Sequence, residues 1–110
     1  MTEPSLTPAQ VAILERFLLA GFRFVTFERY ARYIAVEKGG FVALLDPGGG
    51  KVALFGQAGY LMDEGIGMLM AKPEGQAFVY HNLSIPVTAE LLSAYEHFRT
   101  EVRELLCPRT

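Results

Sequence analysis

The sequence predicts an α+β fold in which a roughly five-stranded antiparallel meander lies between an N-terminal helix and a C-terminal helix. Three observations predict it: an amphipathic segment with a capping residue near each end, strand-like segments between them, and short glycine-rich turns that join those segments. Turns this short connect antiparallel neighbours, because a parallel crossover needs about a dozen residues or more. With 110 residues, we expect a single domain spanning 1–110.

The N-terminal helix is predicted to begin after Thr7. Thr7 is a preferred N-cap residue, Pro8 suits the first helical position, and Gln10 completes a capping box. The apolar residues that follow have helical spacing, and we expect Gly21 to end the helix. The residues predicted to face the core are Val11, Leu14, Leu18 and Phe22, with Ile13 and Phe17 beside them.

The C-terminal helix is predicted to begin after Thr88, a second capping residue, with Glu90 in its first turn. Its apolar residues form a narrow seam of Leu91, Tyr95, Phe98, Val102 and Leu105, and Pro108 prevents the helix from continuing. We expect this seam to pack on the chain's own sheet. A helix pair across a dimer is the alternative.

Between the helices, the apolar pattern changes to that of strands. The predicted strands are Tyr30–Glu37, Phe41–Asp46, Lys51–Phe55, Ile66–Ala71 and Gln76–His81. The segment Phe22–Phe27 is predicted to be a further strand or an extended connection. Gly39 with Gly40, and the run Gly48–Lys51, mark hairpin turns; the latter lacks the strand and helix context of a phosphate-binding loop.

Composition and charge exclude several classes of protein. The net charge of −2 supplies no general attraction to phosphate backbones, so we expect no nucleic-acid partner. The chain has no run of about 18 apolar residues and no basic, apolar start, so we expect no membrane span and a cytoplasmic location. A single cysteine, Cys107, excludes an internal disulfide and a CxxC pair.

Two predicted strands are apolar on both faces. Phe41–Leu45 and Val52–Phe55 do not alternate with polar residues, which indicates that both of their faces leave water. Two helices cover about one face of a five-stranded sheet. The second face must therefore contact another sheet, a curled part of its own sheet, or a second subunit, and homodimerisation is our leading interpretation.

Aromatic and basic residues alternate from Phe22 to Tyr33, and a second polar group follows the strand that ends at His81. Guanidinium and aromatic faces side by side can stack on a planar ligand, although core packing with arginines paired to Glu28 and Glu37 is the simpler interpretation. The candidate ligand-binding residues are Arg29, Arg32, Tyr33, Tyr80 and His81.

His81 is also the one weak candidate for catalysis. An imidazole titrates near neutral pH, but no spacing places a nucleophile beside it, and we predict no catalytic set. Asp63 and Glu64 are adjacent acids without the spaced partners of a metal site. We therefore predict no metal and no cofactor.

The function predicted from these observations is a non-enzymatic interaction or regulatory module that forms a homodimer through its apolar sheet face or its C-terminal helix. The first alternative is a domain that binds an apolar or planar small molecule, in a pocket lined by Phe41, Leu54, Met68, Met70, Phe78 and Tyr80. The second is a small enzyme that uses His81, assisted by Tyr80, Asp63 or Glu64. No residue pattern identifies a substrate, a biological process or a specific partner.

Overall fold

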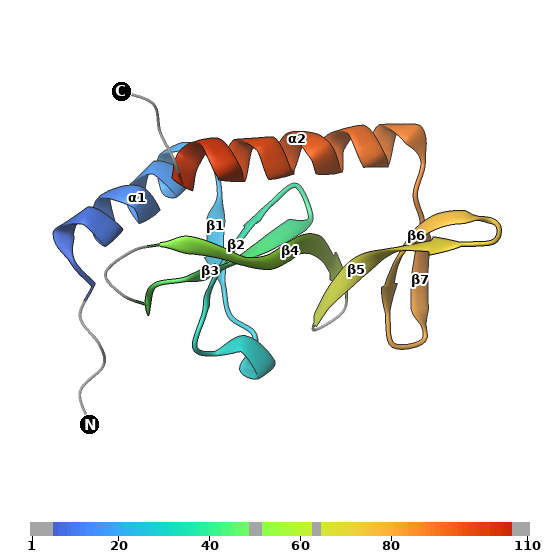
Figure 1. Cartoon of the computed structure of the whole chain (residues 1–110), viewed down its shortest axis with the longest axis horizontal. Coiled ribbons are helices and arrows are strands. Elements are labelled where there is room, and N and C mark those ends of the chain that lie inside the picture. The colour runs from blue at the N-terminus through green and yellow to red at the C-terminus, as the bar shows by residue number, and fades with distance from the viewer. Residues whose placement is uncertain (1–5, 49–51, 63–64, 107–110) are drawn as a thin grey trace.

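The computed structural model has the predicted order of an N-terminal helix, an antiparallel sheet and a C-terminal helix (Figure 1). The structure describes residues 6–48, 52–62 and 65–106. Gly49–Lys51, the pair Asp63 and Glu64, and Cys107, which figured in the sequence predictions, lie outside these residues. The described part of the chain contains no helix long and apolar enough to cross a membrane.

Both helices begin at the predicted caps. Helix α1 spans Pro8–Leu19, and the hydroxyl of Thr7 accepts a hydrogen bond from the Gln10 backbone N–H while the Gln10 side chain accepts one from the Thr7 N–H. Helix α2 spans Ala89–Leu106, and the Thr88 hydroxyl accepts from the Leu91 N–H. The Gln10 amide also donates to the Pro47 carbonyl at 2.6 Å, which fastens α1 to the residue that follows strand β3 (Phe41–Asp46).

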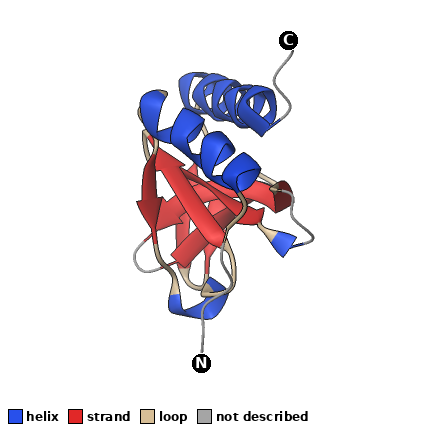
Figure 2. Ribbon diagram, turned by 90° about the vertical axis from the view of Figure 1, so that its left-hand side faces the viewer, coloured by secondary structure: helices blue, strands red, loops and turns tan. Residues whose placement is uncertain are grey.

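In the part of the chain that the structure describes, the sheet has seven strands that pair in chain order, each antiparallel to the next. Their bounds are β1 Arg23–Val25, β2 Ile34–Lys38, β3 Phe41–Asp46, β4 Ala53–Met62, β5 Gly65–Lys72, β6 Gly75–Tyr80 and β7 Leu83–Pro86. A 3-10 helix, η1, covers Glu28–Tyr30. Figure 2 shows both long helices on one side of the sheet and η1 on the other.

The prediction of roughly five strands was wrong, because two short edge strands complete the sheet. The first, β1, lies within Phe22–Phe27, the segment predicted to be a further strand or an extended connection. Strand β1 pairs with β2 and is fixed by an ion pair between Arg23 and Glu37, which are direct partners across the two strands. Strand β7 pairs with β6 and ends at Pro86. A proline can occupy an edge strand because no neighbour needs its missing N–H, but it weakens the sequence signal.

Strand β4 is longer than predicted because it continues through a bulge. Its register against β3 shifts between Val42 and Leu44, and Gly56 adopts φ +66° within the irregular stretch. Glycine tolerates this left-handed conformation at little cost. In the same stretch, the Ala58 carbonyl accepts a hydrogen bond of 2.7 Å from the buried hydroxyl of Tyr95, which ties α2 to β4.

The main core lies between the sheet and the two helices. The α2 seam faces the sheet as expected, with Tyr95, Phe98 and Val102 buried. Phe41 lies at its centre, and its ring is 5.2–6.2 Å from four other aromatic rings. These rings belong to Tyr60, Phe78, Tyr95 and Phe98, so one cluster joins β3, β4, β6 and α2.

The chain itself covers part of the second face of the sheet. Val42 and Leu44 on β3 are buried in a smaller core with Ala35 and Phe27. The residues packed around it come largely from the segment 25–33, which includes η1. The apolar residues on both faces of β3 are therefore buried within one chain.

Helix α1 is rotated relative to the predicted apolar face. It buries Gln10, Leu14 and Phe17, which are spaced by four and three residues, whereas Val11 and Leu18 are exposed. The bond from Gln10 to Pro47 and the edge-to-face contact of Phe17 with Phe22 favour this rotation. The prediction that Val11 and Leu18 face the core was wrong.

The turn between β2 and β3 offers a matched test of the fold. Gly39 and Gly40 have φ values of +64° and +93°, but only at Gly40 would an added Cβ meet another residue, at 2.9 Å from the Tyr60 ring. We expect Gly39→Ala to lower the free energy of unfolding by about 1 kcal/mol, and Gly40→Ala by about 2 kcal/mol or more. Equal losses in urea unfolding would contradict the close packing of this turn on Tyr60.

Tyr95 offers a test with a pH dependence. Tyr95→Phe leaves the Ala58 carbonyl without its donor, and we expect a loss of roughly 1–3 kcal/mol. Burial raises the pKa of Tyr95 above its ordinary 10.0, against the opposing charge of Arg99. Because the folded state holds the phenol proton more tightly, stability should fall as pH rises above about 10.

Tyr95→Phe should lack this part of the alkaline loss. The free energy of unfolding of wild type and variant is measured by urea unfolding from pH 8 to 11. Their difference isolates the contribution of Tyr95 from those of the other tyrosines and the lysines. A difference that is constant across this range would contradict the raised pKa.

Candidate functional site

The structure brings together two of the predicted ligand-binding residues, Arg29 and Tyr80. They lie about 50 residues apart in the chain and line one hollow of about 770 Å³ on the side of the sheet that carries η1. The hollow is lined by Val25, Thr26, Phe27, Glu28, Arg29, Leu61 and Tyr80. A guanidinium and an aromatic ring at one hollow are suited to a planar ligand that carries an acidic group.

The position of Tyr80 depends on a glycine in the neighbouring strand. A Cβ added at Gly65 would lie 2.2 Å from the Tyr80 ring, so the ring packs directly against the β5 backbone. Only glycine leaves this space. The ring therefore lies over a fixed strand, while the opposite wall comes from the turn that includes η1.

Arg32 and Tyr33 lie elsewhere. The Tyr33 ring stacks on Phe55 with centroids 4.2 Å apart, and the Arg32 guanidinium lies 5.5 Å from the centre of the Tyr33 ring. This stack joins the end of the segment 25–33 to β4. Arg32 and Tyr33 therefore lie apart from the hollow at Arg29.

His81 occupies an exposed two-residue turn between β6 and β7. It has φ +52°, and its ring contacts the Tyr80 ring with centroids 4.3 Å apart. Within the described residues, no hydrogen bond joins its imidazole to another side chain. The contact with Tyr80 places His81 next to a wall of the hollow, but no described group near it resembles a nucleophile and base pair.

The residues predicted to line an apolar pocket do not converge. Phe41 and Phe78 pack in the aromatic core, whereas Met68 and Met70 are exposed on β5. Phe41 borders one hollow, Leu54 another and Tyr80 a third. These residues therefore belong to different parts of the molecule.

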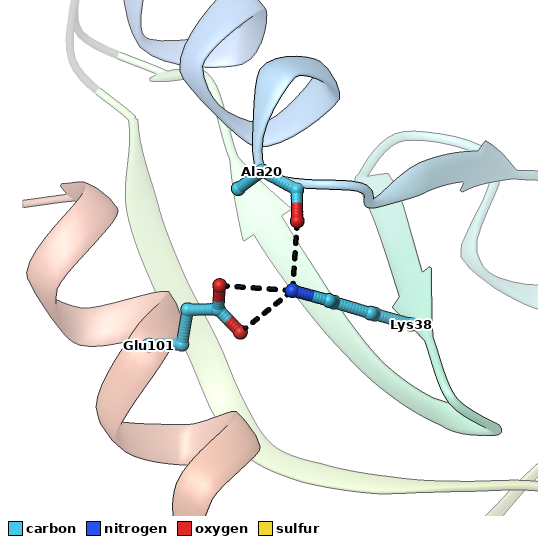
Figure 3. Close-up of polar contacts among 3 residues, drawn as sticks. All are labelled: Ala20, Lys38 and Glu101. Atoms are coloured by element: carbon cyan, nitrogen blue, oxygen red, sulfur yellow. Dashed lines mark hydrogen bonds and ion pairs between the residues drawn. The ribbon is translucent and has the colours of Figure 1, made fainter.

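Another hollow, of about 800 Å³, lies between the β2–β3 turn and α2. Lys38 stands at its border, where its ammonium donates to the Ala20 carbonyl at 2.7 Å and to both Glu101 carboxylate oxygens at 3.0–3.1 Å (Figure 3). The ammonium also lies 5.2 Å from the centre of the Phe22 ring. Its donors are engaged in joining the end of α1 to α2, which is a structural role.

A more prominent feature is the outer surface of α1. Val11, Leu18 and Leu19 are 41%, 50% and 88% exposed, and they follow helical spacing on the part of α1 that faces away from the core. We call these three residues the α1 ridge. All three are large aliphatic side chains, and the exposed Glu15 lies between Val11 and Leu19 on the same part of the helix. Exposed aliphatic side chains of this size are common at interfaces.

Sequence reasoning missed the α1 ridge, although a signal was present. Six large apolar residues between positions 11 and 19 are too many for one helix face, so some had to point outward. It also missed Thr26 and Leu61 in the hollow at Arg29. Their proximity arises only from the course of the segment 25–33 beneath the sheet, which no local pattern encodes.

Within residues 6–48, 52–62 and 65–106, no three histidine, cysteine, aspartate or glutamate side chains are grouped closely enough to hold a metal ion. The chain matches no protein-family model, no curated protein and no solved structure.

Proposed function

We propose that the chain is a cytoplasmic, non-enzymatic interaction module that forms a homodimer through the α1 ridge. The observation that carries the proposal is the exposure of Val11, Leu18 and Leu19 on a helix whose opposite face is well packed. The two interfaces predicted from the sequence, the apolar sheet face and the C-terminal helix, are largely buried within the chain. The α2 seam is buried on the sheet, and the second face of β3 is covered by the segment 25–33.

The geometry of α1 favours a symmetric pair of helices. A helix of 12 residues is about 18 Å long, and two copies can pack antiparallel across a two-fold axis so that each ridge contacts the other. Burying each of the three side chains is worth about 1–2 kcal/mol. The ridge is small compared with a stable dimer interface, so we expect association at micromolar concentration.

Introducing a negative charge on the ridge tests this proposal. We expect Leu18→Glu and Leu19→Glu each to weaken dimerisation by about tenfold or more, because a carboxylate would be buried without a partner. Sedimentation velocity over a dilution series measures the effect. Met70→Glu is the matched control, since Met70 is as exposed as Leu18 but lies on β5.

Two outcomes would refute the proposed dimer. One is a wild-type chain that stays monomeric at high micromolar concentration. The other is a dimer that tolerates both ridge substitutions but is lost in Met70→Glu, which would move the interface to the β5 surface. Circular dichroism of each variant confirms that it is folded.

A second candidate function is the binding of a planar, acidic small molecule at the hollow of Arg29 and Tyr80. The convergence of these two residues with Thr26 favours it. A guanidinium can hold a carboxylate or phosphate by paired hydrogen bonds while the tyrosine ring contacts a planar group.

Native mass spectrometry of the protein purified from cells tests this candidate. We expect a bound small molecule whose occupancy falls at least severalfold in Arg29→Ala and Tyr80→Ala but not in Arg32→Ala, whose guanidinium lies over Tyr33. A ligand-free spectrum for the wild type, or equal loss in Arg32→Ala, would count against the hollow as a binding site.

A further inference from the structure

Within the described residues, one edge of strand β4 is only partly paired. Along the other edge it pairs with β3, whereas on this edge it pairs with β5 only from Tyr60 to Met62. Beyond that point β5 pairs with β6 instead. No described strand pairs with the outer edge of Ala53–Gln57, so this edge can accept a partner there. The Ala58 carbonyl is already bonded to the Tyr95 hydroxyl.

Helix α2 passes over the place where another strand would lie. Three residues on one face of α2 border a hollow of about 300 Å³ with the β4 edge. They are Arg99, Val102 and Arg103, and they oppose Leu54, Gln57 and Ala58 on β4. Val102 and Ala58 are buried, so the base of the hollow is apolar, whereas Leu54 is 42% exposed at its mouth.

The charge at this edge is positive. Arg99 forms an ion pair with Glu96 at 2.9 Å and lies over the Tyr95 ring, while Arg103 has no ion pair within the described residues. The segment Ala53–Ala58 carries no charged side chain. A partner at this edge therefore contacts the Arg103 guanidinium, which forms no ion pair with the described carboxylates.

We propose that the β4 edge binds an extended peptide segment with acidic side chains, which joins the sheet as an added strand beneath α2. Backbone hydrogen bonds to Ala53–Gln57 supply the pairing, an apolar side chain of the peptide enters the hollow over Val102, and its carboxylates pair with Arg99 and Arg103. Strand addition of this kind is a common mode of peptide recognition. The site is separate from the α1 ridge, so the two proposals stand or fall independently.

A second copy of this chain fits the edge less well. If two β4 strands paired across a two-fold axis, neither would bring an acidic side chain, because Ala53–Ala58 contains none. The pairing would also bring Arg99 and Arg103 of both copies together, and like charges at close range oppose association. Charge thus favours an acidic partner.

The test uses the full-length protein and a fluorescein-labelled peptide of about eight residues in which valine alternates with glutamate. We expect fluorescence anisotropy at low salt to show binding that weakens by about tenfold or more in Arg99→Glu and Arg103→Glu. Arg32→Glu, on the other side of the sheet, should bind like wild type. A peptide with lysine in place of glutamate should not bind.

The same peptide with alternate backbone nitrogens methylated separates strand addition from simple charge attraction. It keeps every carboxylate but cannot complete the backbone pairing, and we expect it not to bind. Absence of binding by the unmodified peptide, equal binding by the methylated peptide, or equal loss in Arg32→Glu would overturn the proposal. A dimer strengthened by Arg103→Glu would also overturn it, since it would assign the edge to a second copy.

Discussion

The packing around Phe41 is the constraint on which the rest of the structure depends. Its ring contacts residues of β4, β6 and α2, so a single side chain on β3 joins two other strands to the long helix. Aromatic clusters of this kind stabilise a core by their large buried area and by their ring geometry. Because this cluster fixes α2 over β3 and β4, it also fixes Arg103 above the β4 edge.

Coverage of the second face changes how the apolar strands should be interpreted. The sequence alone indicated that both faces of β3 are buried, and a second subunit was the leading explanation for the second face. In the structure, Phe27 and the residues around it close over Val42 and Leu44. Exposed large apolar side chains remain on α1, β4 and β5, with Phe24 on β1 and Leu83 on β7.

Features encoded by local residue patterns could be predicted from the sequence. The caps at Thr7 and Thr88, the Gly39–Gly40 turn and the α2 seam follow from spacing and side-chain chemistry, and the structure confirms them. The rotation of α1 could not be predicted, because it depends on Gln10 reaching Pro47, 37 residues away. Strands β1 and β7 are too short for a clear alternation. Of the candidate site, only the convergence of Arg29 with Tyr80 combines residues that the sequence had singled out.

We propose that each chain closes its own core and leaves the α1 ridge for a second copy. Methyl NMR spectra recorded over a dilution series report both the existence and the position of such a contact. We expect concentration-dependent shifts for the methyl groups of Val11, Leu18 and Leu19, with Val42 and Leu44 unchanged. Shifts centred on Val42 and Leu44 would contradict it, since they would show that a partner covers the second face of the sheet.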